Sequence, residues 1–145
     1  MMYRFLSRIV FALFISFSTL AQTVTVKIIE TSDVHGAIFP YDLKENKEIN
    51  SSLARVTTYL KELRADSNQI VFLLDNGDVL QGDPVVYYYN FEKTDTIHLY
   101  ADVMNFMKYD AGTVGNHDIE TGHDVYDKFN KEINFPWLAA NAINT

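Results

Sequence analysis

The sequence predicts an α/β protein with a mostly parallel sheet, and three observations lead to this expectation. Apolar runs of strand length alternate with amphipathic runs of helical length. The resulting order, β-α-β-α-β-α-β, is typical of a layered domain in which helices connect parallel strands. Polar clusters follow the first three strands, where such sheets bind ligands.

The first half of the chain supplies a strand, a loop and a helix. Apolar and polar residues alternate over residues 23–30, which predicts a strand. Residues 40–50 are polar and predict a loop. Apolar residues recur at helical spacing over residues 51–67, and either Ser51 or Ser52 can cap the start of that helix.

The second half continues the alternation. Residues 69–75 form a continuous apolar run, as expected for a buried parallel strand. Helical spacing returns over residues 95–109, and a short strand is expected in residues 110–114. A further helix over residues 122–133 leads to a last strand within residues 135–142.

Composition limits the possible functions. The chain has 145 residues, which corresponds to one domain or part of one. It carries 19 Asp and Glu against 12 Lys and Arg, which argues against binding a nucleic-acid polymer through general basic charge. A small nucleotide is still possible, because a metal can meet its phosphate. Cysteine is absent, which excludes disulfides and thiolate metal sites.

The amino-terminal segment has the layout of a secretory signal peptide. Arg4 and Arg8 come before an apolar run over residues 9–17. Small residues, Thr19 and Ala21, stand at the two positions that a signal peptidase recognises. A membrane anchor is the alternative, but the run is short for a span of about 20 residues. We therefore expect residues 1–21 to be removed on export, leaving no stable membrane span and a periplasmic or cell-surface product.

The three polar clusters have the donor chemistry of a metal site. They read "DVHG" at residues 33–36, "GD" at 77–78 and "GNHD" at 115–118. Each alone is also ordinary turn chemistry, but all three in order at strand ends are far more specific. An oxygen and nitrogen set without sulfur suits Zn, Mn, Fe, Co or Mg. Two such ions about 3.5–4 Å apart would activate a water and hold a phosphate oxygen.

The motifs "TSDVHG", "DNGDVLQGDP" and "GTVGNHDIETG" resemble the first three signature blocks of the calcineurin-like metallophosphoesterases. More narrowly, they resemble the exported 5′-nucleotidase / 2′,3′-cyclic-nucleotide phosphodiesterase family, and the similarity covers residues 24–143. The resemblance implies a layered α-β-β-α sandwich of the metallophosphatase type. Residues 22–145 would be the amino-terminal part of its catalytic domain, incomplete at the C-terminus.

The resemblance also implies roles for individual residues. Asp33 and His35 match ligands of a first divalent metal, Asp78 matches the aspartate that bridges two metals, and Asn116 matches a ligand of the second. His117 matches the catalytic histidine, which stabilises charge on the phosphoryl group or aids the leaving oxygen.

Glu120 occupies the place where some relatives of that family carry an aspartate that orients the catalytic histidine. Glutamate could do the same with a longer reach, or could simply be an acid favoured in a first helical turn. Both alternatives stay open here. Glu120 does not decide between the nucleotidase and cyclic-phosphodiesterase branches, although "DNGDVLQG" leans toward the latter.

The family's remaining ligand blocks, Gly-His and Gly-His-x-His, and its substrate-binding C-terminal domain do not occur in this sequence. His98 and His123 lie in helical patterns and are expected to be ordinary histidines. Tyr87 to Tyr89 could stack a base, but three consecutive residues cannot share one face, so packing and exposure are favoured. Trp137 is expected in the core.

The sequence thus predicts metal-dependent hydrolysis of nucleotide phosphate esters by a full-length parent, with little turnover by a truncated chain. One alternative is a nucleotide-sugar or other phosphoester hydrolase, and another is a non-catalytic exported binding remnant of the fold. A nucleotide is the expected partner, a nucleic-acid polymer is not, and the oligomeric state is open.

Overall fold

The computed structural model describes residues 23–140, so the predicted signal peptide, residues 1–21, lies outside the described residues. The elements are β1 (Thr25–Thr31), β2 (Tyr41–Asp42), β3 (Lys47–Glu48), α2 (Leu53–Arg64), β4 (Gln69–Asp75), α3 (Pro84–Tyr87), the π-helix η1 (Tyr88–Glu92), α4 (Leu99–Met107), β5 (Ala111–Thr113), α5 (Asn116–Glu120), α6 (His123–Glu132) and β6 (Trp137–Leu138). No helix among these residues is long and apolar enough to cross a membrane.

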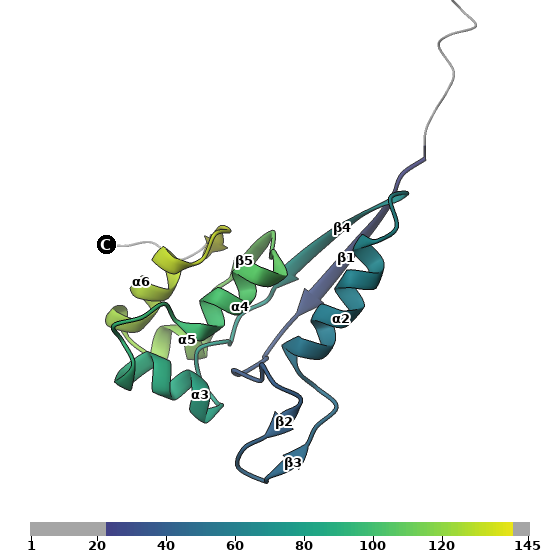
Figure 1. Ribbon diagram of the computed structural model, residues 1–145. Coiled ribbons are helices and arrows are strands. Elements are labelled where there is room, and N and C mark those ends of the chain that lie inside the picture. Colours follow the sequence, from purple (N-terminus) through teal and green to yellow (C-terminus); the bar gives the residue numbers. More distant parts are fainter. Residues whose placement is uncertain (1–22, 141–145) are drawn as a thin grey trace, which may run out of the picture.

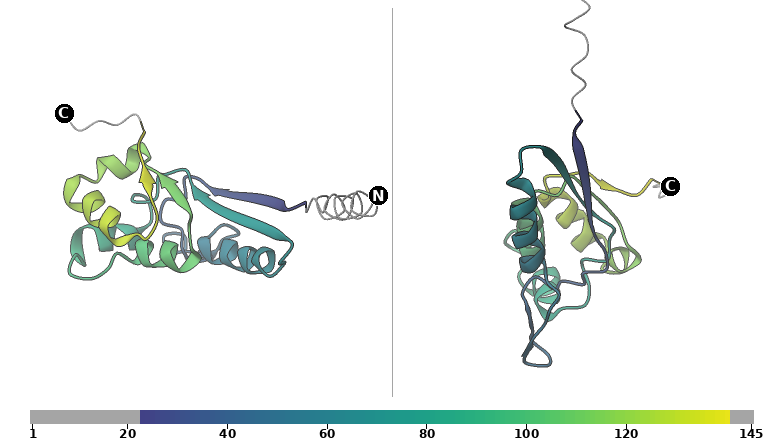
Figure 2. Two further views of the ribbon diagram at one scale, coloured as in Figure 1. Left: turned by 90° about the horizontal axis from the view of Figure 1, so that it is seen from above. Right: turned by 90° about the vertical axis from the view of Figure 1, so that its right-hand side faces the viewer.

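A four-stranded sheet organises the domain, in the order β1-β4-β5-β6 with every neighbouring pair parallel. The predicted α/β class with a mostly parallel sheet is therefore confirmed. Each connection steps in the same direction across the sheet, and right-handed crossovers then put the connecting helices on one face. Figures 1 and 2 show α2 and α4 on the same side of β1 and β4.

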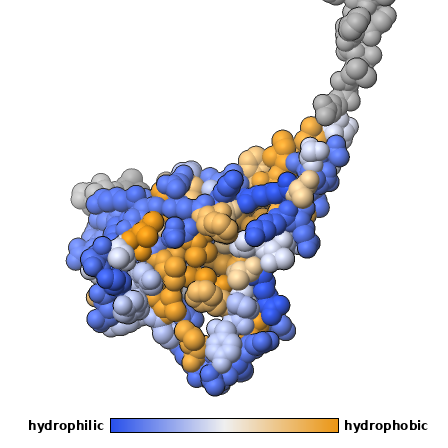
Figure 3. Space-filling view, viewed as in Figure 1, coloured by the Kyte–Doolittle hydropathy of each residue, from blue (hydrophilic) through white to orange (hydrophobic). Residues whose placement is uncertain are grey.

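The core lies between that face and the helices. Ser52 caps α2 by accepting a hydrogen bond from the backbone N–H of Arg55, so of the two predicted caps it is the one used. Leucines of α2, Leu73 of β4 and residues of α4 form one buried cluster. Figure 3 shows further apolar residues gathered in the middle of the helix-bearing face, with hydrophilic residues around them.

The opposite face of the sheet carries apolar side chains that none of the helices within residues 23–140 covers (Figure 2). Strand register puts Val26 beside Ile70 and Ile28 beside Phe72, and paired residues of parallel strands point to the same side. We call this surface the bare sheet face, and its most exposed members are between 41% and 66% exposed: Val24, Val26, Ile28, Ile70, Phe72 and Leu138. The described residues contain one main sheet of the expected α-β-β-α sandwich. In such a sandwich a second sheet would pack against the bare sheet face.

Three segments differ from the sequence-based expectation. The predicted loop over residues 40–50 contains the short antiparallel pair β2 and β3. Residues 84–92, for which no helix was predicted, form α3 and η1, because Asp83 caps the start and Pro84 suits the first helical turn. The residues Asn116 to Glu120, which precede the helix predicted over residues 122–133, form the short helix α5.

Candidate functional site

Two of the three polar clusters are joined by backbone hydrogen bonds between the loops that follow β1 and β4. The N–H of Asp33 donates to the carbonyl oxygen of Gly77 at 3.1 Å, and the N–H of His35 donates to that of Asp78 at 3.0 Å. The predicted convergence at the carboxyl edge of the sheet is therefore present in the fold.

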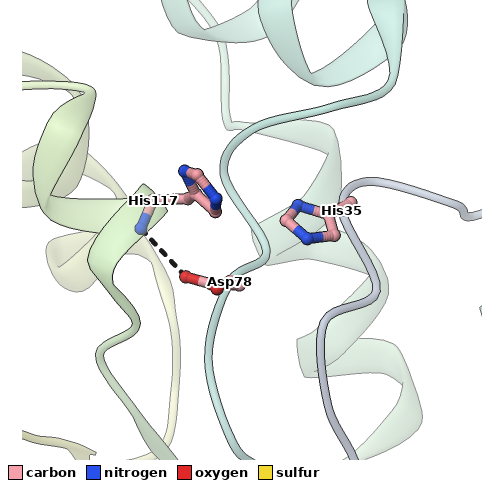
Figure 4. A group of neighbouring side chains, drawn as sticks. All are labelled: His35, Asp78 and His117. Atoms are coloured by element: carbon pink, nitrogen blue, oxygen red, sulfur yellow. Dashed lines mark hydrogen bonds between the residues drawn. The ribbon is translucent and has the colours of Figure 1, made fainter.

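Side chains from all three clusters meet at this edge. Possible ligand atoms of His35, Asp78 and His117 all lie within 4.8 Å of one another. The two imidazole rings are 5.4 Å apart between centroids, and the backbone N–H of His117 donates to Oδ1 of Asp78 at 2.9 Å. Figure 4 shows the three residues, which come from the loop after β1, the loop after β4 and the start of α5.

His35 is held in one orientation by the loop after β4. Its Nδ1 lies 2.8 Å from the carbonyl oxygen of Gln81. A carbonyl only accepts, so Nδ1 carries the proton and Nε2 keeps its lone pair. This is the arrangement that metal-binding histidines use, with the second ring nitrogen bonded to a backbone carbonyl.

His117 is bonded to Glu120, the residue whose role the sequence left open. Nδ1 of His117 lies 2.8 Å from Oε2 of Glu120, one helical turn away in α5. This hydrogen bond raises the pKa of His117 and lowers the pKa of Glu120. Glu120 is thus within reach to orient the ring, as the first alternative required. The side chains of Asn116 and Gln81 nearby further lower the pKa of Glu120.

Asp33 and Asn116 lie beside the cluster rather than in it. Asp33 is exposed, its carboxylate accepts from the hydroxyl of Ser32, and it is not in the group of possible ligands defined by the 4.8 Å limit. Asn116 begins α5, and its side chain lowers the pKa of Glu120 in the same helix. The structure therefore brings together His35, Asp78 and His117 directly, with the other predicted ligands in neighbouring positions.

The backbone at this edge is unusual in conformation. Asp33, His35 and Asp78 have φ angles of 51°, 50° and 61°, in the left-handed region that non-glycine residues rarely adopt. All three are predicted ligands. Left-handed residues of this kind cluster at functional sites, where surrounding contacts hold the chain in place.

Gly77 and Gly115 allow two loops to touch. A Cβ atom on Gly77 would lie 2.5 Å from the backbone nitrogen of Gly115, and one on Gly115 would overlap Oδ1 of Asp78. Gly115 itself has an ordinary extended conformation, with φ of −87°. Its role is therefore to allow close approach to Asp78.

Asp118 is a residue whose importance the sequence analysis missed. Its side chain is fully buried, and its two oxygens accept four backbone N–H groups. Those donors are Gly115 in its own loop and, in the loop after β4, Asp78, Val79 and Leu80. Asp118 therefore fixes the loop of Asp78 against the loop of His117. The only signal in the sequence was its place in "GNHD".

A second buried carboxylate, Asp75, lies beneath the site. It accepts from the hydroxyl of Thr31 at 2.9 Å and from the N–H of Gly77 at 3.0 Å, and Thr31 also bonds to the hydroxyl of Tyr109. Burial raises the pKa of Asp75 to about 6. This network joins the ends of β1 and β4 just before the two loops begin.

The other histidines are outside the cluster. His98 is buried and caps the start of α4: its Nδ1 accepts from the N–H of Tyr100, and its Nε2 faces Asn90. Burial lowers its pKa to about 4, so it is neutral. His123 is exposed at the start of α6 beside Asp127. Trp137 is partly buried against Phe129.

Comparison with known proteins adds independent information. Residues 26–144 match the calcineurin-like phosphoesterase family. The trifunctional nucleotide phosphoesterase YfkN of Bacillus subtilis is 37% identical over 132 residues, which is 86% of this chain and 9% of that protein. A 2′,3′-cyclic-nucleotide 2′-phosphodiesterase/3′-nucleotidase of Yersinia enterocolitica is 32% identical, covering 86% of this chain and 19% of that protein. The 5′-nucleotidase of Bos taurus is 33% identical, covering 83% and 21%.

Solved structures agree with the sequence relatives. The crystal structure of YfkN superimposes with a TM-score of 0.70 at 36% identity, covering 79% of this chain and 36% of that one. A putative 5′-nucleotidase from Staphylococcus aureus gives a TM-score of 0.71 at 32% identity, covering 80% and 22%. The chain spans 9% to 21% of the length of the sequence relatives named above.

The family match extends over residues 26–144, and the fold agrees with that of solved relatives. On these grounds the chain belongs to the calcineurin-like phosphoesterase family.

Proposed function

We propose that the full-length protein hydrolyses phosphate esters of nucleotides with the help of divalent metal ions. The observation that carries this proposal is the convergence of His35, Asp78 and His117 from three separate loops in a chain of this family. Relatives named as nucleotide phosphoesterases and 5′-nucleotidases support the substrate class.

The donor chemistry fits divalent metals. Imidazole nitrogen, carboxylate oxygen and amide oxygen, without sulfur, suit Zn, Mn, Fe, Co or Mg. We propose that Asp33, His35, Asp78 and Asn116 hold two ions, with Asp78 shared between them. Bound there, the ions would supply an activated water and charge neutralisation at the phosphate.

The histidine and glutamate of α5 would serve the leaving group. With Nδ1 of His117 bonded to Glu120, Nε2 is the nitrogen available to substrate. A raised pKa keeps this ring protonated to higher pH, so it can stabilise negative charge on the phosphoryl group or donate a proton to the departing oxygen. We propose that Glu120 orients His117 by bonding to Nδ1, which leaves Nε2–H directed to the substrate.

Export is part of the proposal. A signal peptide cleaved after Ala21 is supported by three features: the basic residues Arg4 and Arg8, the apolar run that follows them, and the small residues before Gln22. Amino-terminal sequencing of the protein isolated from its native host would test this: a start at Gln22 supports it, and a retained Met1 contradicts it.

The activity is tested on the purified full-length protein. We expect Mn²⁺- or Zn²⁺-dependent cleavage of bis-p-nitrophenyl phosphate and release of phosphate from AMP or from 2′,3′-cyclic AMP. Asp78→Asn should abolish turnover, whereas Asp110→Asn should not, because Asp110 bonds to Leu73 away from the site. No cleavage by the metal-loaded protein would favour a non-catalytic binding remnant, and cleavage that does not depend on metal would contradict the metal-dependent mechanism.

A further inference from the structure

Asn90 is a buried amide outside the cluster of possible ligands, and the function proposed above gives it no role. It belongs to η1 and is 6% exposed. Its Nδ2 donates to the carbonyl oxygen of Leu80 at 2.7 Å. Leu80 lies in the loop after β4, which also carries Asp78 and Gln81. A side chain of the helical layer is therefore bonded directly to a loop of the candidate site.

The bond from Asn90 completes the fixation of Leu80. The N–H of Leu80 donates to Asp118 at 2.9 Å, its carbonyl oxygen accepts from Asn90, and its side chain is fully buried. The next residue is Gln81, whose own carbonyl oxygen lies 2.8 Å from Nδ1 of His35. Because the peptide that enters Gln81 is held in place, the position of the carbonyl oxygen that bonds to His35 is restricted.

His98 selects the orientation of the Asn90 amide. The N–H of Tyr100 donates to Nδ1 of His98 at 3.1 Å, so the proton of this ring is on Nε2. Nε2 lies 2.9 Å from Oδ1 of Asn90 and donates to it. With its oxygen used in this way, Asn90 presents its NH₂ group to the carbonyl oxygen of Leu80, which can only accept. The two bonds therefore agree on one orientation of the amide.

His98 is itself held firmly by the helical layer. It is 2% exposed, and its backbone N–H donates to the carboxylate of Glu132 at 2.8 Å. Its ring packs edge-on against Phe129 of α6, with 5.5 Å between the ring centroids. A continuous path of hydrogen bonds thus runs from the packed ends of α4 and α6, through His98 and Asn90, to the loop after β4.

We propose that Asn90, oriented by His98, is a positioning residue for His35. It holds the loop after β4 so that the carbonyl oxygen of Gln81 stays bonded to the His35 ring. The consequence for metal binding rests on the proposed function, in which His35 is a metal ligand. A metal-binding histidine depends on the group that bonds to its second ring nitrogen, and loss of such outer contacts weakens metal binding about 10–100-fold.

The first test measures Mn²⁺ binding to the metal-free full-length protein by calorimetry. In Asn90→Ala the Kd should rise about tenfold, at the low end of that range, because Asn90 acts through the loop and not on the ring itself. Asn105→Ala is the matched control. Asn105 is on α4 and its Nδ2 also donates to a backbone carbonyl, that of Glu132 at 2.8 Å, so its loss loosens the helical layer without removing a bond to the loop. An unchanged Kd in Asn90→Ala, or an equal rise in Asn105→Ala, would overturn the proposal.

Two substitutions of His98 separate the path of hydrogen bonds from the capping of α4, and both leave Asn90 in place. Asparagine can still cap the helix but is too short to reach Asn90, whereas glutamine can donate to Asn90 but is a poor cap. His98→Asn should therefore raise the Kd for Mn²⁺ about fivefold, and His98→Gln should change it by less than about twofold. Equal values in the two variants, or the opposite order, would contradict the proposal.

A metal-free measurement separates this inference from the proposed function. Amide hydrogen exchange, followed by mass spectrometry, reports how firmly residues 79–83 are held. Exchange in this segment should be faster than in the wild-type protein for Asn90→Ala and His98→Asn, and unchanged for Asn105→Ala. Unchanged exchange in the first two variants would refute the inference whatever the metal result. If the wild-type protein binds no Mn²⁺ but the variants show the expected exchange, only the proposed function fails. Far-UV circular dichroism confirms that each variant is folded.

Discussion

Replacing Asp118 by asparagine should destabilise the protein more than any other charge-removing substitution at a described carboxylate. One carboxylate oxygen accepts the N–H groups of Val79 and Leu80 at 2.8 and 2.9 Å. The other accepts those of Asp78 and Gly115 at 2.9 and 2.8 Å. An amide has only one accepting oxygen, so two N–H groups lose their acceptor in either orientation of the side chain. A buried donor without a partner costs about 1–3 kcal/mol, so the loss should be about 2–6 kcal/mol.

Urea denaturation followed by far-UV circular dichroism gives the free energy of unfolding for this comparison. Asp110→Asn is the matched control, because Asp110 accepts a single backbone N–H, that of Leu73, and is exposed. The control should change the free energy of unfolding by less than about 1 kcal/mol. If Asp118→Asn lowers the free energy of unfolding no more than Asp110→Asn does, the four hydrogen bonds do not hold the two loops together and the reasoning is wrong.

Three further predictions concern other residues of the site and the core. Gly115→Ala should lower kcat more than a hundredfold, as about 3 kcal/mol of lost transition-state stabilisation would, because the new Cβ displaces the Asp78 carboxylate; normal turnover would contradict this. Glu120→Gln should lower kcat about tenfold and move the alkaline limb of the pH–rate profile to lower pH, because the pKa of His117 falls once its partner is neutral and the ring loses its proton earlier; metal content measured in parallel should be constant. Because the pKa of His98 falls to about 4 in the folded state, the unfolded chain binds an extra proton between about pH 6.5 and 4, and stability should drop by about 3 kcal/mol as pH falls through that window. His98→Gln should remove that loss in urea titrations at a series of pH values, and an unchanged acid dependence would show that another group is responsible.

The regular elements were predictable because their residues follow simple periods. The apolar run of residues 69–75 became β4 with the same bounds, and the spacing of leucines after Ser52 gave α2. The polar clusters could also be placed at one edge, because parallel strands put their carboxyl ends together. Periodicity and topology together were sufficient for the sheet and for the location of the site.

The contacts that hold the site together could not be predicted in this way. Asp118 bonds to residues about forty positions earlier in the chain, and no local pattern reports a partner at that distance. The helix α5 spans only five residues, too few for a helical period to appear. The α3–η1 segment contains a π-helical turn, whose spacing differs from the 3.6-residue repeat by which helices are recognised.

The bare sheet face has a consequence for work with the protein at the bench. Apolar patches of several hundred Å² on an isolated domain promote association in solution. Any segment or partner that covers Val26, Ile28 and Phe72 would therefore govern whether the protein stays dispersed, even if it contributes nothing to catalysis. Variants that lose such a cover should aggregate into inclusion bodies, whereas their catalytic residues stay intact. Genetic selection for solubility and genetic selection for turnover should therefore identify different sets of residues.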